Sequence, residues 1–363
     1  MNVPLFDTKS KNNDILLSRF NLLLNKGKFV LGENLKTLED NLAKFLNSKY
    51  VVGVNSGTDA LEISLKCLGI KNGDVVITSG FTYFATIEAI HNVGGIPYLA
   101  DINRDSLQID LHNLDKNILN KAKFIIPVHL FGGYVNIEEL LKISKNFNLK
   151  IVEDVAQSFG TKVNGKFLGN FGHTGAFSFY PTKTLGAMGD AGAITTNSKK
   201  LYEDILKMRN HGHIDRNNFK FSGRNSRLDE IQAIYLNLKL QSINKDIASR
   251  KHIADEYHLG LKHIKDLKFY NDKLQTFNYY PIVTKTELNR NQLVNFLKSR
   301  NIETAIYYKK PLTDLNFSWI AKGKSYKNID YIKKRILCLP IYPNLSKSKL
   351  SYTIKSIREF YEA

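Results

Sequence analysis

The sequence predicts an α/β protein with a large domain over residues 1–245 and a smaller C-terminal α+β domain over residues 246–363. Between residues 50 and 200, short β-branched runs alternate with amphipathic stretches, as in a parallel sheet covered by helices on both faces. The chain has 363 residues and a mass of 41.4 kDa. This size exceeds one ordinary core of roughly 100 to 200 residues and therefore indicates two domains.

Seven candidate strands follow one another and predict one mixed, mostly parallel, seven-stranded sheet. They are residues 50–54, 75–78, 96–99, 124–128, 150–153, 176–179 and 193–196. Helical periodicity between them predicts helices over residues 58–68, 86–92 and 137–147. Ligands of such sheets bind at the carboxyl ends of the strands, so the functional site is expected there.

The pattern changes near residue 225. Residues 226–229, Ser-Arg-Leu-Asp, form a capping-box pattern that predicts the start of a long helix. Beyond residue 245 the chain is richer in Lys, Tyr and Asn. Here we expect helices over residues 290–299 and 350–360 and strands over residues 279–283 and 303–308. This part is interpreted as the smaller domain, hinged on the long helix.

Composition excludes several classes of protein. Hydrophobic residues at 43% and charged residues at 24% are values of a globular chain, not of a disordered or coiled-coil one. No run of 18 apolar residues and no export signal is present, so we expect a cytoplasmic protein without a membrane span. Cys67 and Cys338 lack metal or redox spacing and the histidines do not cluster, so buried thiols and no metal site are expected.

The chain is strongly basic, with 52 Lys and Arg against 34 Asp and Glu and a net charge of +18. Such an excess suits nucleic acid, an anionic membrane or phosphorylated small molecules. The basic residues are dispersed in singles and pairs, and no helix-turn-helix or RNA-binding motif is evident. We therefore expect neither a nucleic-acid nor a membrane partner, and a nucleic-acid-binding regulator is the remote alternative.

Residues 54–61, Val-Asn-Ser-Gly-Thr-Asp-Ala-Leu, join the end of a strand to the start of a helix. The free N–H groups and the dipole of a helix N-terminus favour a phosphate there, and Thr58 adds a hydroxyl. Taken alone, the same residues also fit a simple helix cap.

Residues 151–158, Ile-Val-Glu-Asp-Val-Ala-Gln-Ser, place acids at the carboxyl end of an apolar strand. Strand alternation followed by a bend sets Asp154 at the edge of the sheet, with Gln157 one turn later beside it. Taken alone, an acid at a strand end is more often a capping residue.

Lys183 stands in a segment crowded with Gly, Ala and apolar side chains. Desolvation there would lower the pKa of the lysine and make it a nucleophilic amine suited to Schiff-base chemistry. Together the three segments supply a helix terminus for phosphate, a carboxylate for a ring nitrogen and a lysine for an aldehyde. Pyridoxal 5′-phosphate (PLP) requires all three.

At this point the sequence resembles the DegT/StrS family of sugar aminotransferases, which share the aspartate aminotransferase fold, fold type I of the PLP-dependent transferases. The resemblance covers nearly the whole chain. The matching stretches are residues 29–32, 55–61, 127–132, 152–157, 177–192, 223–233 and 339–343. Some relatives carry histidine in place of the lysine and perform dehydration, so Lys183 favours transamination.

The resemblance also implies roles at the cofactor. Lys183 would bind PLP covalently and move protons, Asp154 would pair with the ring nitrogen, and Gln157 would bond the phenolic oxygen. Tyr83 would lie against the face of the ring.

The phosphate end is implied by the same resemblance. Gly57, Thr58 and Ser178 would hold the phosphate. Asn225 would reach the phosphate in the neighbouring subunit, which makes the enzyme a homodimer with shared active sites.

The implied reaction moves an amino group from glutamate to a keto sugar attached to a nucleotide. Tyr180 and Lys220 are expected to contact the sugar diphosphate. Many relatives read His-Tyr-Pro-x-Pro-Leu-His near residue 307, whereas this chain reads Tyr307-Tyr308-Lys-Lys-Pro-Leu-Thr313. Tyr307 and Tyr308 are nevertheless expected to bind substrate, because aromatic surface and positive charge still suit a nucleoside diphosphate.

The overall pattern looks most like the branch that aminates dTDP-3-keto-6-deoxyhexoses to 3-amino-3,6-dideoxy sugars for surface polysaccharides. The alternative is amination at C4 of a UDP- or GDP-linked 4-keto-6-deoxy sugar. The same lysine would serve both reactions, so the sequence leaves both open.

Overall fold

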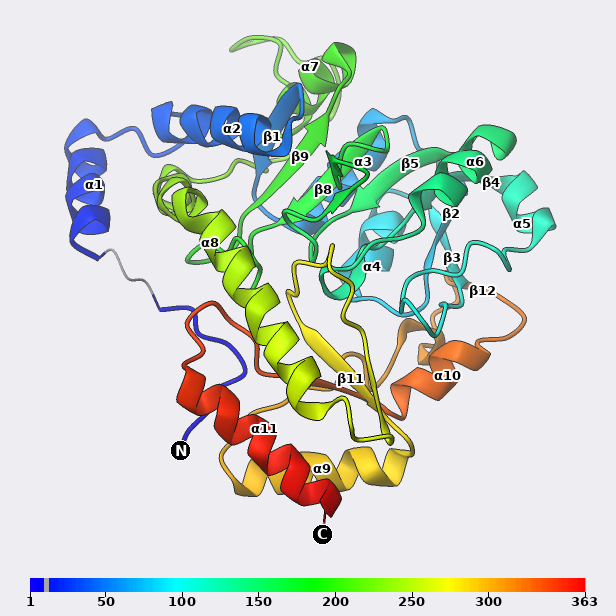
Figure 1. Ribbon diagram of the computed structural model, residues 1–363. Helices are drawn as coiled ribbons and strands as arrows, with labels where there is room; N and C mark the ends of the chain where they lie inside the picture. Colours follow the sequence, from blue (N-terminus) through cyan, green and yellow to red (C-terminus); the bar gives the residue numbers. More distant parts are fainter. Residues whose placement is uncertain (10–12, 363) are drawn as a thin grey trace.

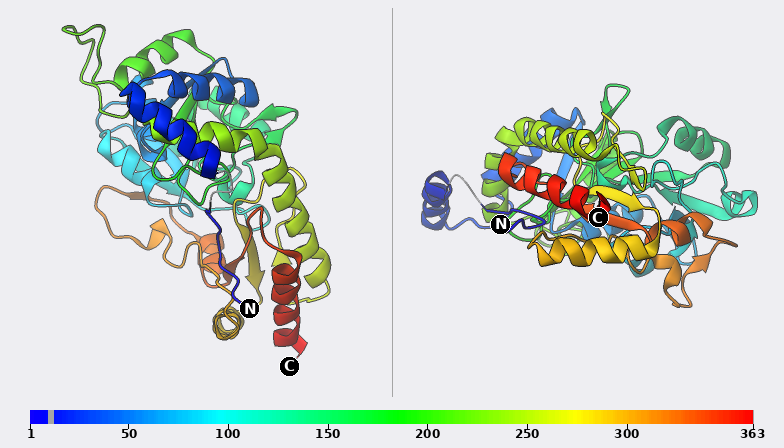
Figure 2. Two further views of the ribbon diagram at one scale, coloured as in Figure 1. Left: turned by 90° about the vertical axis from the view of Figure 1, so that its left-hand side faces the viewer. Right: turned by 60° about the horizontal axis from the view of Figure 1, so that its bottom comes forward.

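The computed structural model describes residues 1–9 and 13–362. Figure 1 shows a large sheet with its helices in one half of the molecule and a smaller sheet with helices in the other, joined by the long helix α8 (Glu230–Leu261). Both chain termini lie beside the smaller sheet. Figure 2 shows helix α1 (Asn13–Lys26) at the edge of the molecule, away from its centre.

The large sheet has the strand order β1-β9-β8-β5-β4-β2-β3-β12. Its strands are β1 (Tyr50–Val54), β2 (Val75–Ser79), β3 (Ile96–Ala100), β4 (Ala122–Ile126), β5 (Lys150–Asp154), β8 (Thr174–Ser178), β9 (Gly192–Thr196) and β12 (Ala321–Lys322). Only β9 is antiparallel to its neighbours. The seven predicted strands are thus present within two residues of their expected bounds. The eighth, β12, has only two residues, too few to give a pattern in the sequence.

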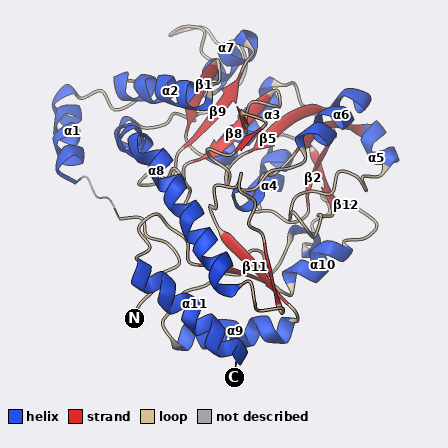
Figure 3. Ribbon diagram, viewed as in Figure 1, coloured by secondary structure: helices blue, strands red, loops and turns tan. Residues whose placement is uncertain are grey.

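Helices cover both faces of this sheet, as Figure 3 shows. They are α2 (Glu33–Leu46), α3 (Gly57–Cys67), α4 (Ala85–Asn92), α5 (Lys116–Lys121), α6 (Ile137–Phe147) and α7 (Lys199–Met208). Successive strand residues enter different cores: Ile151 packs on the α2 and α6 side, whereas Val152 packs on the α3 and α7 side. Burial on both faces explains why these strands read as apolar runs.

The smaller antiparallel sheet has the order β10-β11-β13. It comprises β10 (Leu267–Phe269), β11 (Tyr280–Thr284) and β13 (Ile336–Leu339), with helices α9 (Glu287–Ser299), α10 (Lys327–Lys333) and α11 (Lys347–Glu362). The remaining short elements are β6 (Lys162–Val163), β7 (Lys166–Phe167), η1 (Leu130–Gly132) and η2 (Leu312–Asp314). Among residues 1–9 and 13–362, no helix is long and apolar enough to cross a membrane.

Two features of this half differ from expectation. Residues 303–308 do not form the predicted strand, because only Ala305 makes a bridge, to Cys338. The first residues of the chain also belong here, since Val3 pairs with Ile302 and is fully buried in the small core. Helix α8 passes through residue 245 without a break, and the domain boundary at that point stays a prediction.

The predicted capping box at residues 226–229 is wrong, because α8 begins at Glu230 and Asp229 makes no side-chain cap. The Ser226 hydroxyl instead donates to Asp59 at 2.7 Å. Glu230 is buried and caps α2, whose own N-cap, Gly32, has no side chain. Its carboxylate accepts backbone N–H groups of residues 32, 34 and 35 at 2.8 to 3.0 Å. One acid of α8 thus satisfies the free amides at the start of another helix.

Replacing Glu230 by Ala is expected to destabilise the protein by about 2 to 4 kcal/mol, because it leaves buried N–H groups without an acceptor. Urea unfolding followed by circular dichroism measures the change. The control is Glu33→Ala on the first turn of α2, where the side chain is 81% exposed. The control should change stability by no more than about 0.5 kcal/mol. Equal effects of the two substitutions would contradict this account of the cap.

Candidate active site

A cavity of about 590 Å³ opens at the carboxyl ends of β5 and β8, beside the N-termini of α3 and α4. Ten of the side chains predicted for the site line it: Gly57, Thr58, Tyr83, Asp154, Gln157, Ser178, Tyr180, Lys183, Tyr307 and Tyr308. Ten of the twelve predicted residues, from segments far apart in the chain, therefore lie together in one cavity. In the described ranges, no group of three or more His, Cys, Asp and Glu side chains is placed to hold a metal ion.

The start of α3 forms one end of the cavity. Ser56 is the N-cap, and its hydroxyl accepts the backbone N–H of Asp59 at 3.0 Å. A Cβ atom on Gly57 would lie 2.7 Å from the Cβ of Ser178, so only glycine lets the helix approach β8 this closely. Within the described residues, the backbone N–H groups of Gly57 and Thr58 have no acceptor. These free donors, with the Ser178 hydroxyl, fit a phosphate group.

Asp154 lies at the end of β5, and its side chain is almost completely buried. One carboxyl oxygen accepts the Thr86 hydroxyl at 3.0 Å, and the other accepts the Ala156 N–H at 3.1 Å. Burial raises the pKa of this acid, and the bonds from Ala156 and Thr86 and the charge of Lys183 oppose the rise. Each oxygen accepts one of these hydrogen bonds and keeps a lone pair free, which fits a protonated ring nitrogen.

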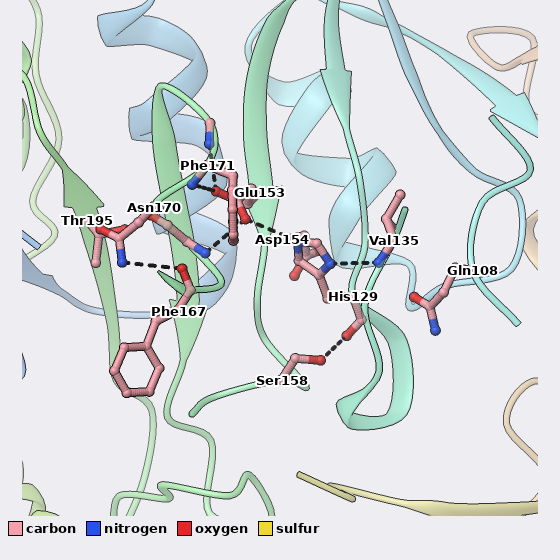
Figure 4. Close-up of polar contacts among 12 residues, drawn as sticks. Gln108, His129, Val135, Glu153, Asp154, Ser158, Phe167, Asn170, Phe171 and Thr195 are labelled. Carbon is pink, nitrogen blue, oxygen red and sulfur yellow. Dashed lines mark hydrogen bonds and ion pairs between the residues drawn. The ribbon is translucent and has the colours of Figure 1, made fainter. Parts of the chain in front are cut away.

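The preceding residue, Glu153, points to the opposite side of the strand, as Figure 4 shows. Its carboxylate accepts three backbone N–H groups of the turn at residues 169–172, at 2.7 to 2.9 Å. It also lies 3.2 Å from Nε2 of His129, whose Nδ1 accepts the N–H of Val135. Since Nδ1 is an acceptor, the imidazole proton is assigned to Nε2. Neither residue was among the predicted site residues, although both lie in the matching stretches 127–132 and 152–157.

Gln157 connects the cavity to the smaller sheet's side of the molecule. Its Oε1 accepts the backbone N–H of Phe131 at 2.9 Å, and its Nε2 donates to the hydroxyl of Tyr308 at 3.0 Å. The ring of Tyr308 packs edge-on against Phe81, with centroids 5.5 Å apart. Tyr308, expected to contact substrate, is therefore bonded to a residue expected to contact the cofactor.

Lys183 lies on the loop that follows β8, and its N–H donates to the carbonyl of Tyr180 at 2.8 Å. The loop is tight, because a Cβ atom on Gly186 would meet the carbonyl oxygen of Pro181. Burial lowers the pKa of Lys183 to about 8, and the charge of Asp154 opposes the shift. An appreciable fraction of this amine is therefore neutral, and nucleophilic, near physiological pH.

Two predicted residues lie outside the cavity of their own chain. Lys220 pairs with Asp204 at 2.7 Å, and Asn225 is exposed and bridges to Asn210. Tyr83 and Tyr180 lie at the rim of the cavity, 64% and 52% exposed. The cavity of the single chain therefore does not include Lys220 or Asn225.

A model of the DegT/DnrJ/EryC1/StrS aminotransferase family matches residues 11–358. A pleiotropic regulatory protein of Geobacillus stearothermophilus is 34% identical over 99% of both chains. UDP-2-acetamido-2-deoxy-3-oxo-D-glucuronate aminotransferase of Pseudomonas aeruginosa is 33% identical over 96% of both. dTDP-3-amino-3,4,6-trideoxy-α-D-glucose transaminase of Streptomyces venezuelae is 31% identical over 99% of this chain and 96% of its own.

The fold agrees with these matches. The crystal structure of S. venezuelae DesV in complex with ketimine intermediate has a TM-score of 0.94 and 30% identity, and the match covers 100% of this chain and 99% of DesV. The predicted fold class, enzyme class and cofactor are thereby confirmed. The chain belongs to the DegT/DnrJ/EryC1/StrS family of PLP-dependent sugar aminotransferases.

Proposed function

We propose that this enzyme transfers an amino group from glutamate to a nucleotide-linked keto-deoxysugar, with Lys183 and Asp154 as its catalytic residues. One observation carries the proposal. A single cavity combines a helix terminus with free N–H groups, a buried carboxyl group and a lysine with a lowered pKa. When bound, PLP supplies an electron sink for the carbanion that forms at the amine-bearing carbon.

Each residue then has a defined task. Gly57, Thr58 and Ser178 hold the phosphate, and Asp154 keeps a proton on the ring nitrogen. Lys183 holds the aldehyde carbon through Nζ and, once released, takes the proton from the amine-bearing carbon of glutamate. In the second half of the reaction the same amine group returns a proton to the aminated carbon of the sugar.

For the sugar, we propose dTDP-3-keto-6-deoxyhexose as the acceptor and dTDP-3-amino-3,6-dideoxyhexose as the product, for surface polysaccharide. The names of two relatives, a 3-oxo-sugar aminotransferase and a dTDP-3-amino-sugar transaminase, support amination at C3. Exposed aromatic rings at the rim, Tyr83 and Tyr180, together with Tyr307 in the wall, offer stacking surface for sugar and nucleotide.

We further propose that a second copy of the chain completes each site. Helix α1 is apolar on both sides: Leu16 and Leu23 pack against α8, whereas Leu17 and Leu24 are 58% and 64% exposed. Other exposed apolar side chains, Met188 among them, lie near the start of α8 and close to the cavity. A second copy would cover this surface and bring the partner's Asn225 to the phosphate.

The cofactor assignment is tested by adding PLP to cofactor-free protein. Wild type should develop a visible absorption band, and Lys183→Ala should not, because the covalent link needs the amine of residue 183. The rate of development should rise with pH and level off above about 8, because only the neutral amine attacks the aldehyde.

The matched control is Lys200→Ala, which removes an exposed lysine of α7 and should leave the band intact. A colourless wild type would rule out the proposed function. A rate that keeps rising to about pH 10 would show that Lys183 behaves as an ordinary surface amine.

The position of amination is tested with glutamate and two acceptors, a dTDP-linked 3-keto and a UDP- or GDP-linked 4-keto deoxysugar. The expected product carries nitrogen at C3 and forms with the higher kcat/KM, as located by NMR of the purified sugar nucleotide. Amination of the 4-keto acceptor alone would replace the C3 proposal by the C4 alternative.

The dimer is tested with Leu17→Asp combined with Leu24→Asp. Two charges on the outer face of α1 should weaken self-association at least about tenfold, because burial of each would be unfavourable. Sedimentation equilibrium measures the association, and PLP affinity should fall with it. Leu288→Asp, at a 65% exposed position of α9, is the control and should leave association unchanged. A wild type that is monomeric at micromolar concentration would refute the shared site.

A further inference from the structure

The amide of Gln157 has a fixed orientation. Because its Oε1 accepts the backbone N–H of Phe131 at 2.9 Å, its NH₂ group is directed to the other side. One hydrogen of that group is donated to the hydroxyl of Tyr308, at an N–O distance of 3.0 Å. The second hydrogen has no acceptor among residues 1–9 and 13–362.

The hydroxyl group of Tyr308 also has an unused hydrogen. Its hydroxyl oxygen accepts from Gln157, so the hydroxyl hydrogen is available for donation, and no acceptor for it is found in the described part of the chain. Burial raises the pKa of this phenol well above its ordinary value, so it stays a neutral donor at physiological pH. Both side chains line the cavity that also contains Asp154 and Lys183.

Two unused donors on atoms 3.0 Å apart form a site for one oxygen with negative charge. Three kinds of oxygen are available to such an enzyme: those of its substrates, those of the cofactor's phosphate, which we assign to the start of α3, and the phenolic oxygen of the cofactor. The exposed rings at the rim, Tyr83 and Tyr180, are placed for the sugar nucleotide. Tyr308 is half-buried and lies close enough to Asp154 for the charge of that carboxyl group to help raise its pKa. In pyridoxal the phenolic oxygen stands on the carbon next to the one that bears the aldehyde, so it accompanies the atom held by Lys183.

We propose that Tyr308 is a second donor to the phenolic oxygen of PLP, acting as a pair with Gln157, and not a contact to the sugar. This inference rests on the proposed function and adds a residue to it. The family resemblance implied that Tyr308 contacts the substrate, whereas its hydrogen bond to Gln157 favours a contact to the cofactor.

The pair has a chemical consequence. The phenolate oxygen shares a proton with the nitrogen of Lys183 when the two are linked through the cofactor's aldehyde carbon. Two donors stabilise the negative charge on that oxygen and weaken its hold on the shared proton. The pKa for loss of the shared proton is therefore lower, so that the enzyme without substrate populates both the protonated and the deprotonated state of this group.

The test is Tyr308→Phe, which removes the hydroxyl and keeps the ring against Phe81. In the loaded enzyme without substrate, the pH midpoint of the visible absorption change should rise by about one unit, the size expected for loss of one hydrogen bond to a charged oxygen. The KM for the sugar nucleotide should change less than threefold. A spectrophotometric pH titration and steady-state kinetics supply the two readings.

Tyr307→Phe is the matched control, because it removes the neighbouring phenol of the same cavity. It should leave the pH midpoint unchanged. A Tyr308→Phe midpoint within about 0.2 unit of wild type would overturn the inference, whether or not the sugar KM rises. Adding PLP to the wild type distinguishes this outcome from failure of the proposed function. If the wild type becomes coloured but the Tyr308→Phe midpoint does not move, the inference fails and the proposed function stands.

Discussion

The active site depends on two neighbouring acids at the end of β5 that point in opposite directions. Glu153 is completely buried, and a buried carboxylate is costly unless its charge is compensated. Three backbone N–H groups and the imidazole of His129 supply that compensation. Because successive residues of a strand alternate, fixing Glu153 on one side sends Asp154 to the other, into the cavity.

The main chain around Asp154 is fixed as well. Its N–H donates to the carbonyl of Pro127 at 2.9 Å, and its carbonyl accepts the N–H of His129 at 3.0 Å. His129 thus supports the site twice, through its backbone and through its ring. With the main chain fixed and the carboxyl group bonded to Thr86 and Ala156, the side chain of Asp154 keeps one direction while burial raises its pKa. The same burial favours the neutral amine of Lys183, and the two groups oppose each other's shift.

The sequence predicts the parts of this protein whose residues carry a local pattern. The seven longer strands have five residues each and are mostly apolar, and Lys183, Asp154 and Gly57 stand in segments of unusual composition. Contacts between residues far apart in the sequence leave no such local pattern. The cap of α2 by Glu230 joins positions about 200 apart, and Val3 near the start of the chain pairs with Ile302. Residues 303–308 show the converse error, because they have a β-branched pattern although only Ala305 pairs with another strand.

The segment at residues 307–313 departs from the family pattern at two positions, and the place of each residue in the structure shows what its replacement changes. Two histidines expected there are replaced by Tyr307 and Thr313. Tyr307 lines the cavity, so its replacement changes a wall that faces ligands. Thr313 does not line the cavity. It is nearly buried and packs against Gly80, where a Cβ atom would lie 2.7 Å from its methyl carbon. A bulky ring at 313 would collide with this backbone as it stands. Local packing therefore accommodates Thr313, and of the two replaced positions only Tyr307 lies in the cavity wall.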